Sequence, residues 1–344
     1  MAHKLMTLGA MTTTRSTATS RLANVVAVPP SRRSRLALTA GHHVLRPINC
    51  ALPHNRLGIA AARTVTAAIM AVGGPPPRGT RVTPVRSGAV RGEWVRAADV
   101  EFGDRAIYFV HGSGYVLCSA RTHRGLAARL SRETGLPVFV IDYRLAPEHR
   151  FPAAADDVAA GYRWLLGNGY RATDVLIAAD SAGGHLTVDL LLDNARTTIP
   201  QPAGAVLFSP LIDLSFRLAE HHQRHGAEAM ASARVGRSAA ELYMAQEPAD
   251  SPRLRLTIPP GTALPPLFVQ ASDTEMLVGD AVHLREMVTA AGGSCELELW
   301  PGQVHVFQAL PLLVPEAAPA LRRAARFIAD ALAASDTSTR ERVS

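Results

Sequence analysis

Near the middle of the chain the sequence reads Ala178-Ala179-Asp180-Ser181-Ala182-Gly183-Gly184. An apolar, partly β-branched run precedes it at residues 175–178, and apolar residues at helical spacing follow it at residues 185–192. Ser181 is therefore predicted on a tight turn from a buried strand into a helix, which is the geometry of a nucleophile elbow. Small residues suit such a turn, because strand and helix backbones approach closely there. The first helical N–H groups then face the serine.

Strands and helices alternate along the chain from about residue 79. Apolar, strand-like runs occur at residues 106–110, 137–141, 205–208, 266–270 and 295–299. Helical patterns lie between and after them, among others at residues 122–133, 280–287 and 316–332. This alternation predicts an α/β fold with a mostly parallel central sheet covered by helices on both faces.

Composition shifts divide the chain into segments. The acid-free, Ser- and Arg-containing start is expected to be a mobile basic tail, and a helical segment broken by prolines is expected to form a cap. A long polar interval interrupts the later alternation and is expected to lie above the carboxyl edge of the sheet. The predicted segments are the tail 1–35, the cap 36–78, the main domain 79–335 with an insertion at about 216–259, and a C-terminal tail 336–344.

The charge of the chain is unevenly distributed. The 344 residues are 47% hydrophobic and 19% charged, which is typical of a packed globular protein, and the formal net charge is +7. No Asp or Glu precedes Glu93, whereas 13 of the 36 Lys and Arg residues do, so the remainder holds 23 basic and 29 acidic residues. The basic character thus belongs to the N-terminal quarter, and no nucleic-acid partner is expected for the core.

Metal and disulfide signatures are weak. The three cysteines, Cys50, Cys118 and Cys295, are too sparse for a disulfide framework or a metal site and are expected to be thiols in a reducing compartment. His221 and His225 have the i, i+4 spacing of a zinc helix, but no Glu follows His221, so a solvated helix face is favoured. No metal and no cofactor are predicted.

The sequence favours a cytoplasmic location. Residues 57–74 form the longest apolar stretch, but it contains Arg63 and many alanines and glycines, so no membrane span is predicted. Residues 1–10 show no secretory cleavage pattern. As an alternative, the basic tail would associate weakly with anionic membrane surfaces or the cell envelope.

The order of candidate residues predicts acyl transfer, which needs a nucleophile, a base, an acid that orients the base, and donors for the oxyanion. His305 lies on a predicted loop after the last strand and is the expected base. Asp273 follows the strand at residues 267–269 and is the expected acid; Glu275 and Asp280 fall in the following turn and helix and are less favoured. The order Ser, Asp, His is that of α/β-hydrolases.

The predicted oxyanion hole comes from a glycine-containing loop after an early strand, His111-Gly112-Ser113-Gly114. Its backbone N–H groups would act with the N–H of Ala182, the residue after the nucleophile. Glycines let such a loop approach the substrate closely.

Together these motifs resemble the hormone-sensitive-lipase-like branch of the α/β-hydrolase carboxylesterases, over roughly residues 80–333. The resemblance rests on the loop at 111–114, the stretch Asp142-Tyr143-Arg144-Leu145-Ala146-Pro147-Glu148, the elbow at 179–184, and the late Asp273 and His305. It implies an α/β-hydrolase fold with a helical cap over the pocket and no cofactor. It also implies Ser181, Asp273 and His305 as catalytic residues, Ser113, Gly114 and Ala182 as the oxyanion hole, and His111, Gly112, Asp180 and Gly183 as supporting residues.

Two positions depart from the family pattern, because Ser113 and Ala179 each replace a glycine. The expected function is hydrolysis of short- to medium-chain carboxylic esters or lipids through an acyl-enzyme. The alternatives are a non-catalytic ligand-binding protein on the same fold and an amide deacetylase; the sequence does not fix the oligomeric state.

Overall fold

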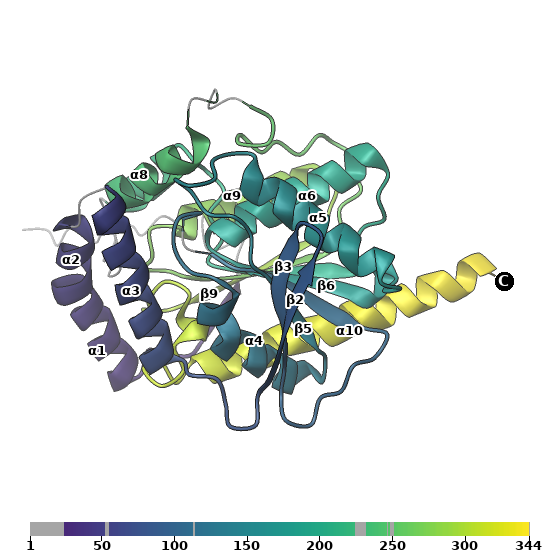
Figure 1. The fold of residues 1–344 in the computed structure, drawn as a ribbon, viewed down its shortest axis with the longest axis horizontal. Coiled ribbons are helices and arrows are strands. Elements are labelled where there is room, and N and C mark those ends of the chain that lie inside the picture. Colours follow the sequence, from purple (N-terminus) through teal and green to yellow (C-terminus); the bar gives the residue numbers. More distant parts are fainter. Residues whose placement is uncertain are drawn as a thin grey trace, which may run out of the picture.

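The computed structural model describes residues 24–51, 55–112, 114–223, 232–245, 247 and 251–343. Within these residues, a nine-stranded sheet lies in the order β1-β9-β8-β7-β6-β4-β5-β3-β2 (Figure 1). The strands are β1 (Asn24–Val25), β2 (Arg81–Ser87), β3 (Val90–Arg96), β4 (Ala106–Val110), β5 (Val138–Ile141), β6 (Val175–Asp180), β7 (Gly204–Phe208), β8 (Leu267–Ser272) and β9 (Cys295–Trp300). Among these described strands, β3 alone runs in the opposite direction: it pairs antiparallel with β2 and β5, and all other pairs are parallel.

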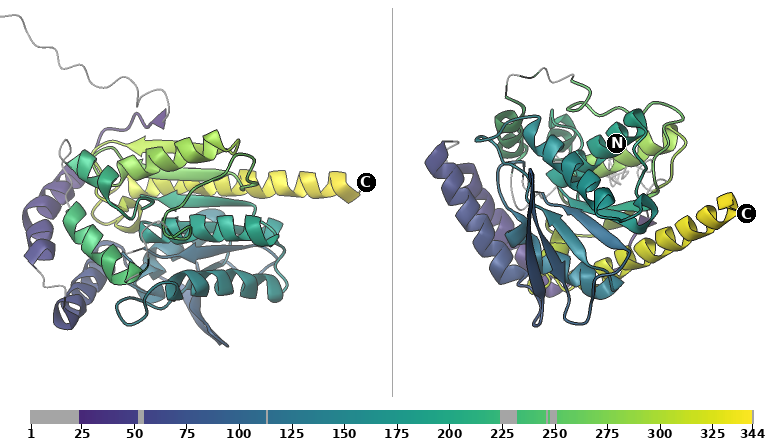
Figure 2. Two further views of the ribbon diagram at one scale, coloured as in Figure 1. Left: turned by 90° about the horizontal axis from the view of Figure 1, so that it is seen from above. Right: turned by 45° about the vertical axis from the view of Figure 1, so that its right-hand side comes forward.

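Helices cover both faces of the sheet (Figure 2). One face packs on α5 (Ala153–Gly167), α6 (Ala182–Thr197) and α9 (Val278–Ala290), and the other on α4 (Ala120–Thr134) and α10 (Ala317–Val343). Residues along each strand alternate between these two cores: Tyr108 packs in the first, and Ile107 and Phe109 in the second. Because both faces are buried, the central strands are apolar throughout rather than alternating with polar residues. The predicted α/β-hydrolase fold class is confirmed.

The segments predicted as a cap contain four helical segments between β1 and β2 and two in the insertion. They are α1 (Arg32–Ala40), a π-helical turn (Gly41–Leu45), α2 (Arg46–Ala51) and α3 (Arg56–Gly73), then α7 (Arg217–Gln223) and α8 (Ala233–Met244). In Figure 1 the first group lies at the left of the sheet and α8 lies above it. Arg63 of α3 donates to Val116 O at 2.8 Å and pairs with Glu148 at 2.8 Å, which fixes α3 to the main domain.

By length and composition alone, α3 is long and apolar enough to cross a membrane. Only 17% of its 18-residue window is buried within the protein. The structure shows it packed along α4. Its C-cap glycine, Gly74, lies directly against Gly125 of α4.

Both predicted tails need correction. Residues 1–23 lie outside the described part of the chain, but residues 24–35 are ordered into the fold. Asn24 and Val25 pair with β9, and Ser31 caps α1 while its N–H donates to Glu316 at 2.5 Å. These partners lie far away in the sequence, so local composition gave no sign of them. At the other end, α10 continues to Val343 and includes the predicted tail from residue 336.

The contact between α3 and α4 predicts the effect of one substitution. A Cβ at Gly125 would overlap the carbonyl oxygen of Gly74, whereas a Cβ at Gly167, the last residue of α5, would meet nothing within 4 Å. We expect Gly125→Ala to lower the free energy of unfolding in urea by about 1–3 kcal/mol through overpacking. Gly167→Ala is the matched control and is expected to leave it unchanged or raise it by up to about 1 kcal/mol. Equal effects of the two substitutions would contradict this packing.

Candidate active site

Ser181 lies at the junction of β6 and α6 with φ 49° and ψ −121°, a conformation that residues with side chains rarely adopt. Three backbone hydrogen bonds of 2.9 Å hold it there: its N–H donates to Phe208 O, and its carbonyl accepts from Gly184 and Leu211. The sharp turn leaves the Ser181 side chain partly exposed at the carboxyl edge of the sheet.

The small residues around Ser181 are required by close approaches. A Cβ at Gly183 would overlap Val110 O of β4, and a Cβ at Gly184 would lie 2.6 Å from Pro210 Cβ. Ala179, which replaces the usual first glycine of the elbow, is fully buried and packs in the core shared with α5 and α6. The turn therefore accommodates its methyl group as a core contact.

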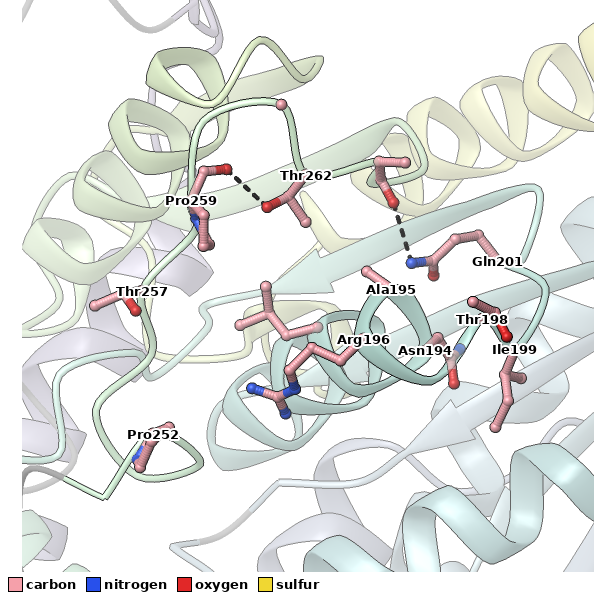
Figure 3. Close-up of a pocket in the computed structure, with 13 residues that line it drawn as sticks. Asn194, Ala195, Arg196, Thr198, Ile199, Gln201, Pro252, Thr257, Pro259 and Thr262 are labelled. Carbon is pink, nitrogen blue, oxygen red and sulfur yellow. Dashed lines mark hydrogen bonds between the residues drawn. The ribbon is translucent and has the colours of Figure 1, made fainter.

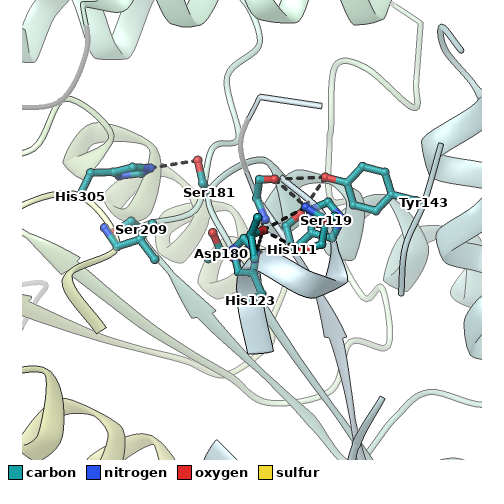
Figure 4. A network of polar contacts seen from close by, with 11 residues as sticks. His111, Ser119, His123, Tyr143, Asp180, Ser181, Ser209 and His305 are labelled. Atoms are coloured by element: carbon teal, nitrogen blue, oxygen red, sulfur yellow. Dashed lines mark hydrogen bonds and ion pairs between the residues drawn. The ribbon is translucent and has the colours of Figure 1, made fainter. Parts of the chain in front are cut away.

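The structure brings together two of the three predicted catalytic side chains. His305 Nε2 lies 3.0 Å from Ser181 Oγ, and His305 points at the serine in Figure 4. On the other side of the ring, His305 Nδ1 lies 2.6 Å from Glu275 Oε2, a side chain with no exposed surface. A hydroxyl, an imidazole and a carboxylate thus form one hydrogen-bonded chain.

The acid in this chain is Glu275, so the prediction of Asp273 is corrected. Asp273 is exposed, and its Oδ1 accepts the N–H of Gly302 at 2.8 Å. The physical reason is the length of β8, which continues to Ser272 in register with Trp300, two residues beyond the predicted strand. The turn comes later, and Glu275 Oε1 closes it by accepting the Ser272 N–H at 2.8 Å. The polar pair Ser272-Asp273 concealed this extension from sequence reasoning.

Asp273 and its neighbours instead connect the two loops that carry Glu275 and His305. Gln303 N–H donates to Ser272 Oγ at 3.0 Å, and Thr274 Oγ1 donates to Gln303 O at 3.1 Å. Directly after β7, Ser209 Oγ accepts the N–H of Val306 at 3.2 Å. Hydrogen bonds therefore fix the backbone on both sides of His305.

Asp280, the other alternative acid, has a structural contact. Its Oδ1 accepts the backbone N–H groups of Ile212 and Asp213 at 2.8 and 2.7 Å. Complete burial raises the pKa of Asp280 to about 7. The carboxyl group thus fixes the loop after β7.

The predicted oxyanion loop lies against the elbow. Gly112 N–H donates to Asp180 Oδ1 at 3.0 Å, and a Cβ at Gly112 would overlap that carboxylate. Gly114 has φ 62° and lies beside Ala239 of α8, so the insertion contacts this loop. Ala182 is fully buried as the first residue of α6. Ser113 lies outside the described residues, so the three-donor oxyanion hole stays a prediction.

A buried polar cluster supports this loop from below (Figure 4). Asp180 Oδ1 lies 3.2 Å from His123 Nε2, and Tyr143 Oη donates to His111 O at 2.8 Å. The His111 ring stacks on Tyr143 with centroids 4.2 Å apart. Burial lowers the pKa of His111 to about 4, so this imidazole is neutral at pH 7. His111 and Asp180 therefore hold backbone in place, while Ser181 and His305 face each other.

A separate pocket of about 550 Å³ lies at the far end of α6 (Figure 3). Arg196, Gln201 and Thr262 are among its lining residues. The 16 residues of α6 place it about 20 Å from Ser181. Among the described residues, no group of three or more His, Cys, Asp or Glu side chains is arranged to hold a metal. His225, which has the spacing of a zinc helix with His221, lies outside them.

Comparisons with known proteins agree with this geometry. The sequence pattern of a family described as alpha/beta hydrolase fold matches residues 107–309. The chain is 34% identical over 276 residues to carboxylesterase/phospholipase LipF of Mycobacterium tuberculosis, covering 76% of this chain and 73% of that protein. It is 36% identical over 247 residues to an acetyl-hydrolase of Streptomyces hygroscopicus, covering 71% and 81%.

Among solved structures, the fold matches that of an esterase from the bacterial hormone-sensitive lipase family. The TM-score is 0.78 with 29% sequence identity, and the match covers 89% of this chain and all of that chain.

The contact between His305 and Glu275 predicts a spectroscopic signature. A short hydrogen bond from Nδ1–H to a buried carboxylate shifts that proton strongly downfield in a proton NMR spectrum. We expect such a resonance in the unmodified protein and in Asp273→Asn, and its loss in Glu275→Gln. A resonance that survives in Glu275→Gln and disappears in Asp273→Asn would restore Asp273 as the partner of His305.

Proposed function

The chain belongs to the α/β-hydrolase fold family, in its hormone-sensitive-lipase-like branch of esterases, and from this premise we propose that it hydrolyses carboxylic esters with Ser181 as the nucleophile. The observation that carries the proposal is the continuous hydrogen-bonded chain from Ser181 Oγ through His305 to Glu275. That arrangement supplies the nucleophile, base and orienting acid of acyl transfer.

The first half of the reaction forms an acyl-enzyme. As Ser181 Oγ attacks the ester carbonyl carbon, His305 Nε2 accepts the hydroxyl proton, and Glu275 stabilises the resulting imidazolium through Nδ1–H. When the tetrahedral intermediate collapses, the bond between the carbonyl carbon and the alcohol oxygen breaks. His305 then donates its proton to the departing alkoxide.

The second half reverses these roles with water as the nucleophile. His305 Nε2 takes a proton from water as the water oxygen attacks the acyl carbon, and it returns a proton to Ser181 Oγ as the acid is released. The N–H groups of Ala182, Gly114 and Ser113 are the proposed oxyanion donors; loss of one such donor typically costs about 10²–10³ in turnover. The partial positive charge at the N-terminus of α6 also stabilises the negative charge of the oxyanion.

The proposed substrates are small carboxylic esters with short to medium acyl chains. The name of one relative, an acetyl-hydrolase, supports the short end of this range, and the name of another, a carboxylesterase/phospholipase, supports an ester substrate. A panel of p-nitrophenyl esters from acetate to palmitate, with the matching anilides, tests it. Faster turnover of the anilides would favour an amide deacetylase instead.

Labelling with a fluorophosphonate probe tests the proposed nucleophile. We expect labelling of the folded protein and none of Ser181→Ala, with hydrolysis of p-nitrophenyl butyrate lost in parallel, because Oγ is the attacking atom. Ser209→Ala is the matched control, as this serine lies nearby but faces Val306 N–H, and its labelling is expected to persist. Absence of labelling in folded, unmodified protein would favour a ligand-binding protein.

Steady-state kinetics test the assignment of the acid. Glu275→Gln is expected to lower kcat by about 10³–10⁴, since the imidazole loses both its orientation and the stabilisation of its charged form. Asp273→Asn keeps an acceptor for Gly302 N–H and is expected to lower kcat by less than about tenfold. Similar losses in both variants would contradict the distinct positions of the two carboxylates.

A further inference from the structure

A continuous stripe of exposed residues runs along the outer side of the cap. The helices α1 and α2 are joined through the π-helical turn without interruption, and every fourth residue along them is exposed. The exposed fractions are 69% for Leu36, 54% for Val44 and 42% for Ile48. We call this set the outer stripe; it comprises Arg32, Leu36, Ala40, Val44 and Ile48.

The outer stripe lies between a packed side and a polar side of the same helical segment. Ala37, Gly41 and Leu45 line an apolar pocket of about 360 Å³ with α3 and the loop after His305. On the other side, Arg35, Thr39 and His43 are exposed. An apolar stripe flanked by arginines is the arrangement of helices that lie in the surface of a membrane.

The loop after His305 extends this surface. Leu312 and Leu313, which are 48% and 40% exposed, line the same pocket as Leu36, and the Arg33 guanidinium donates to Leu312 O. Of the ten exposed large hydrophobic residues in the described chain, nine lie in residues 24–73 or at these two leucines. Exposed apolar surface is therefore concentrated at one end of the molecule, which marks an interaction surface.

The positive charge of residues 24–73 indicates an anionic partner for this surface. Residues 24–73 contain six arginines and no Asp or Glu. Two copies of such a surface would repel each other, whereas an anionic surface would attract it. Arg32, Arg33 and Arg35 are exposed beside the apolar residues, so cationic and apolar contacts would form together.

We propose that the outer stripe, with Leu312 and Leu313, docks the protein on an anionic lipid surface. Apolar side chains enter the boundary between headgroups and acyl chains while the arginines contact lipid phosphates. The loop at residues 306–313 follows His305 directly, so docking would bring the candidate active site close to a source of lipid esters.

Sedimentation with sucrose-loaded vesicles tests this proposal without turnover, so it can fail or succeed independently of the esterase assignment. The full chain is expected to bind vesicles of phosphatidylcholine with 30% phosphatidylglycerol and not vesicles of phosphatidylcholine alone. One cation near such a surface changes binding about fivefold. Arg32→Glu with Arg35→Glu should therefore weaken partitioning by about 25-fold or more.

A matched control separates the effect of the charges on α1 from the effect of the net charge of the whole protein. Arg322 and Arg326 are exposed on α10, and reversing both with glutamate changes the net charge equally. This variant is expected to bind within about threefold of the unmodified protein. To test the apolar contacts, Val44→Gln is combined with Ile48→Gln, and this variant should bind the vesicles about tenfold more weakly. Thermal unfolding by circular dichroism confirms that each variant is folded.

Three outcomes would overturn the proposal. If the charge reversals on α1 and on α10 weakened vesicle binding equally, binding would depend only on the net charge of the protein. Loss of binding on deletion of residues 2–23, with none in the outer-stripe variants, would assign binding to that segment. Dimers in sedimentation velocity that the Val44 and Ile48 substitutions dissociate, without vesicle binding, would identify a second copy as the partner.

Discussion

The close approach of the elbow to the strand beside it is the constraint on which the whole site depends. Gly183 lies against Val110 O, and Gly112 lies against the Asp180 carboxylate, so neither position has space for a side chain. Ser181 accepts an unfavourable φ of 49° because backbone hydrogen bonds on both sides fix it. The Asp180 carboxylate accepts the Gly112 N–H, and Asp180 directly precedes Ser181. This contact therefore positions the oxyanion loop relative to the nucleophile.

Sequence reasoning predicted the parts that depend on local pattern. Apolar runs identified the buried strands, and the small residues around Ser181 identified the elbow, because both effects act within a few residues. His305 followed from the order of elements. The choice between Asp273 and Glu275 depended on where β8 ends, and that end is set by pairing with Trp300 on β9. Residues 24–35 were assigned to a tail because their partners, β9 and Glu316, are distant in sequence.

The stretch at residues 142–148 carries no catalytic group, yet it joins three parts of the molecule. Asp142 accepts the N–H of Ala120 at 3.0 Å at the start of α4, and Tyr143 supports the oxyanion loop through His111 O. Glu148 pairs with Arg63 of the cap. Several neighbours therefore constrain its residue types at once, although it takes no part in the chemistry.

The anchoring of the cap has a consequence for biosynthesis. The Ser31 N–H donates to Glu316, 285 positions later, and Leu312 N–H donates to Gly73 O at 3.0 Å. A ribosome releases α1 and the end of α3 long before Glu316 and Leu312, at about 5–20 residues per second. During that interval of tens of seconds α4 is already available to α3, but the apolar residues of α1 lack the C-terminal loop on which they dock. Chaperones or lipid would meet them before the rest of the enzyme exists, and such high contact order also slows the last folding step.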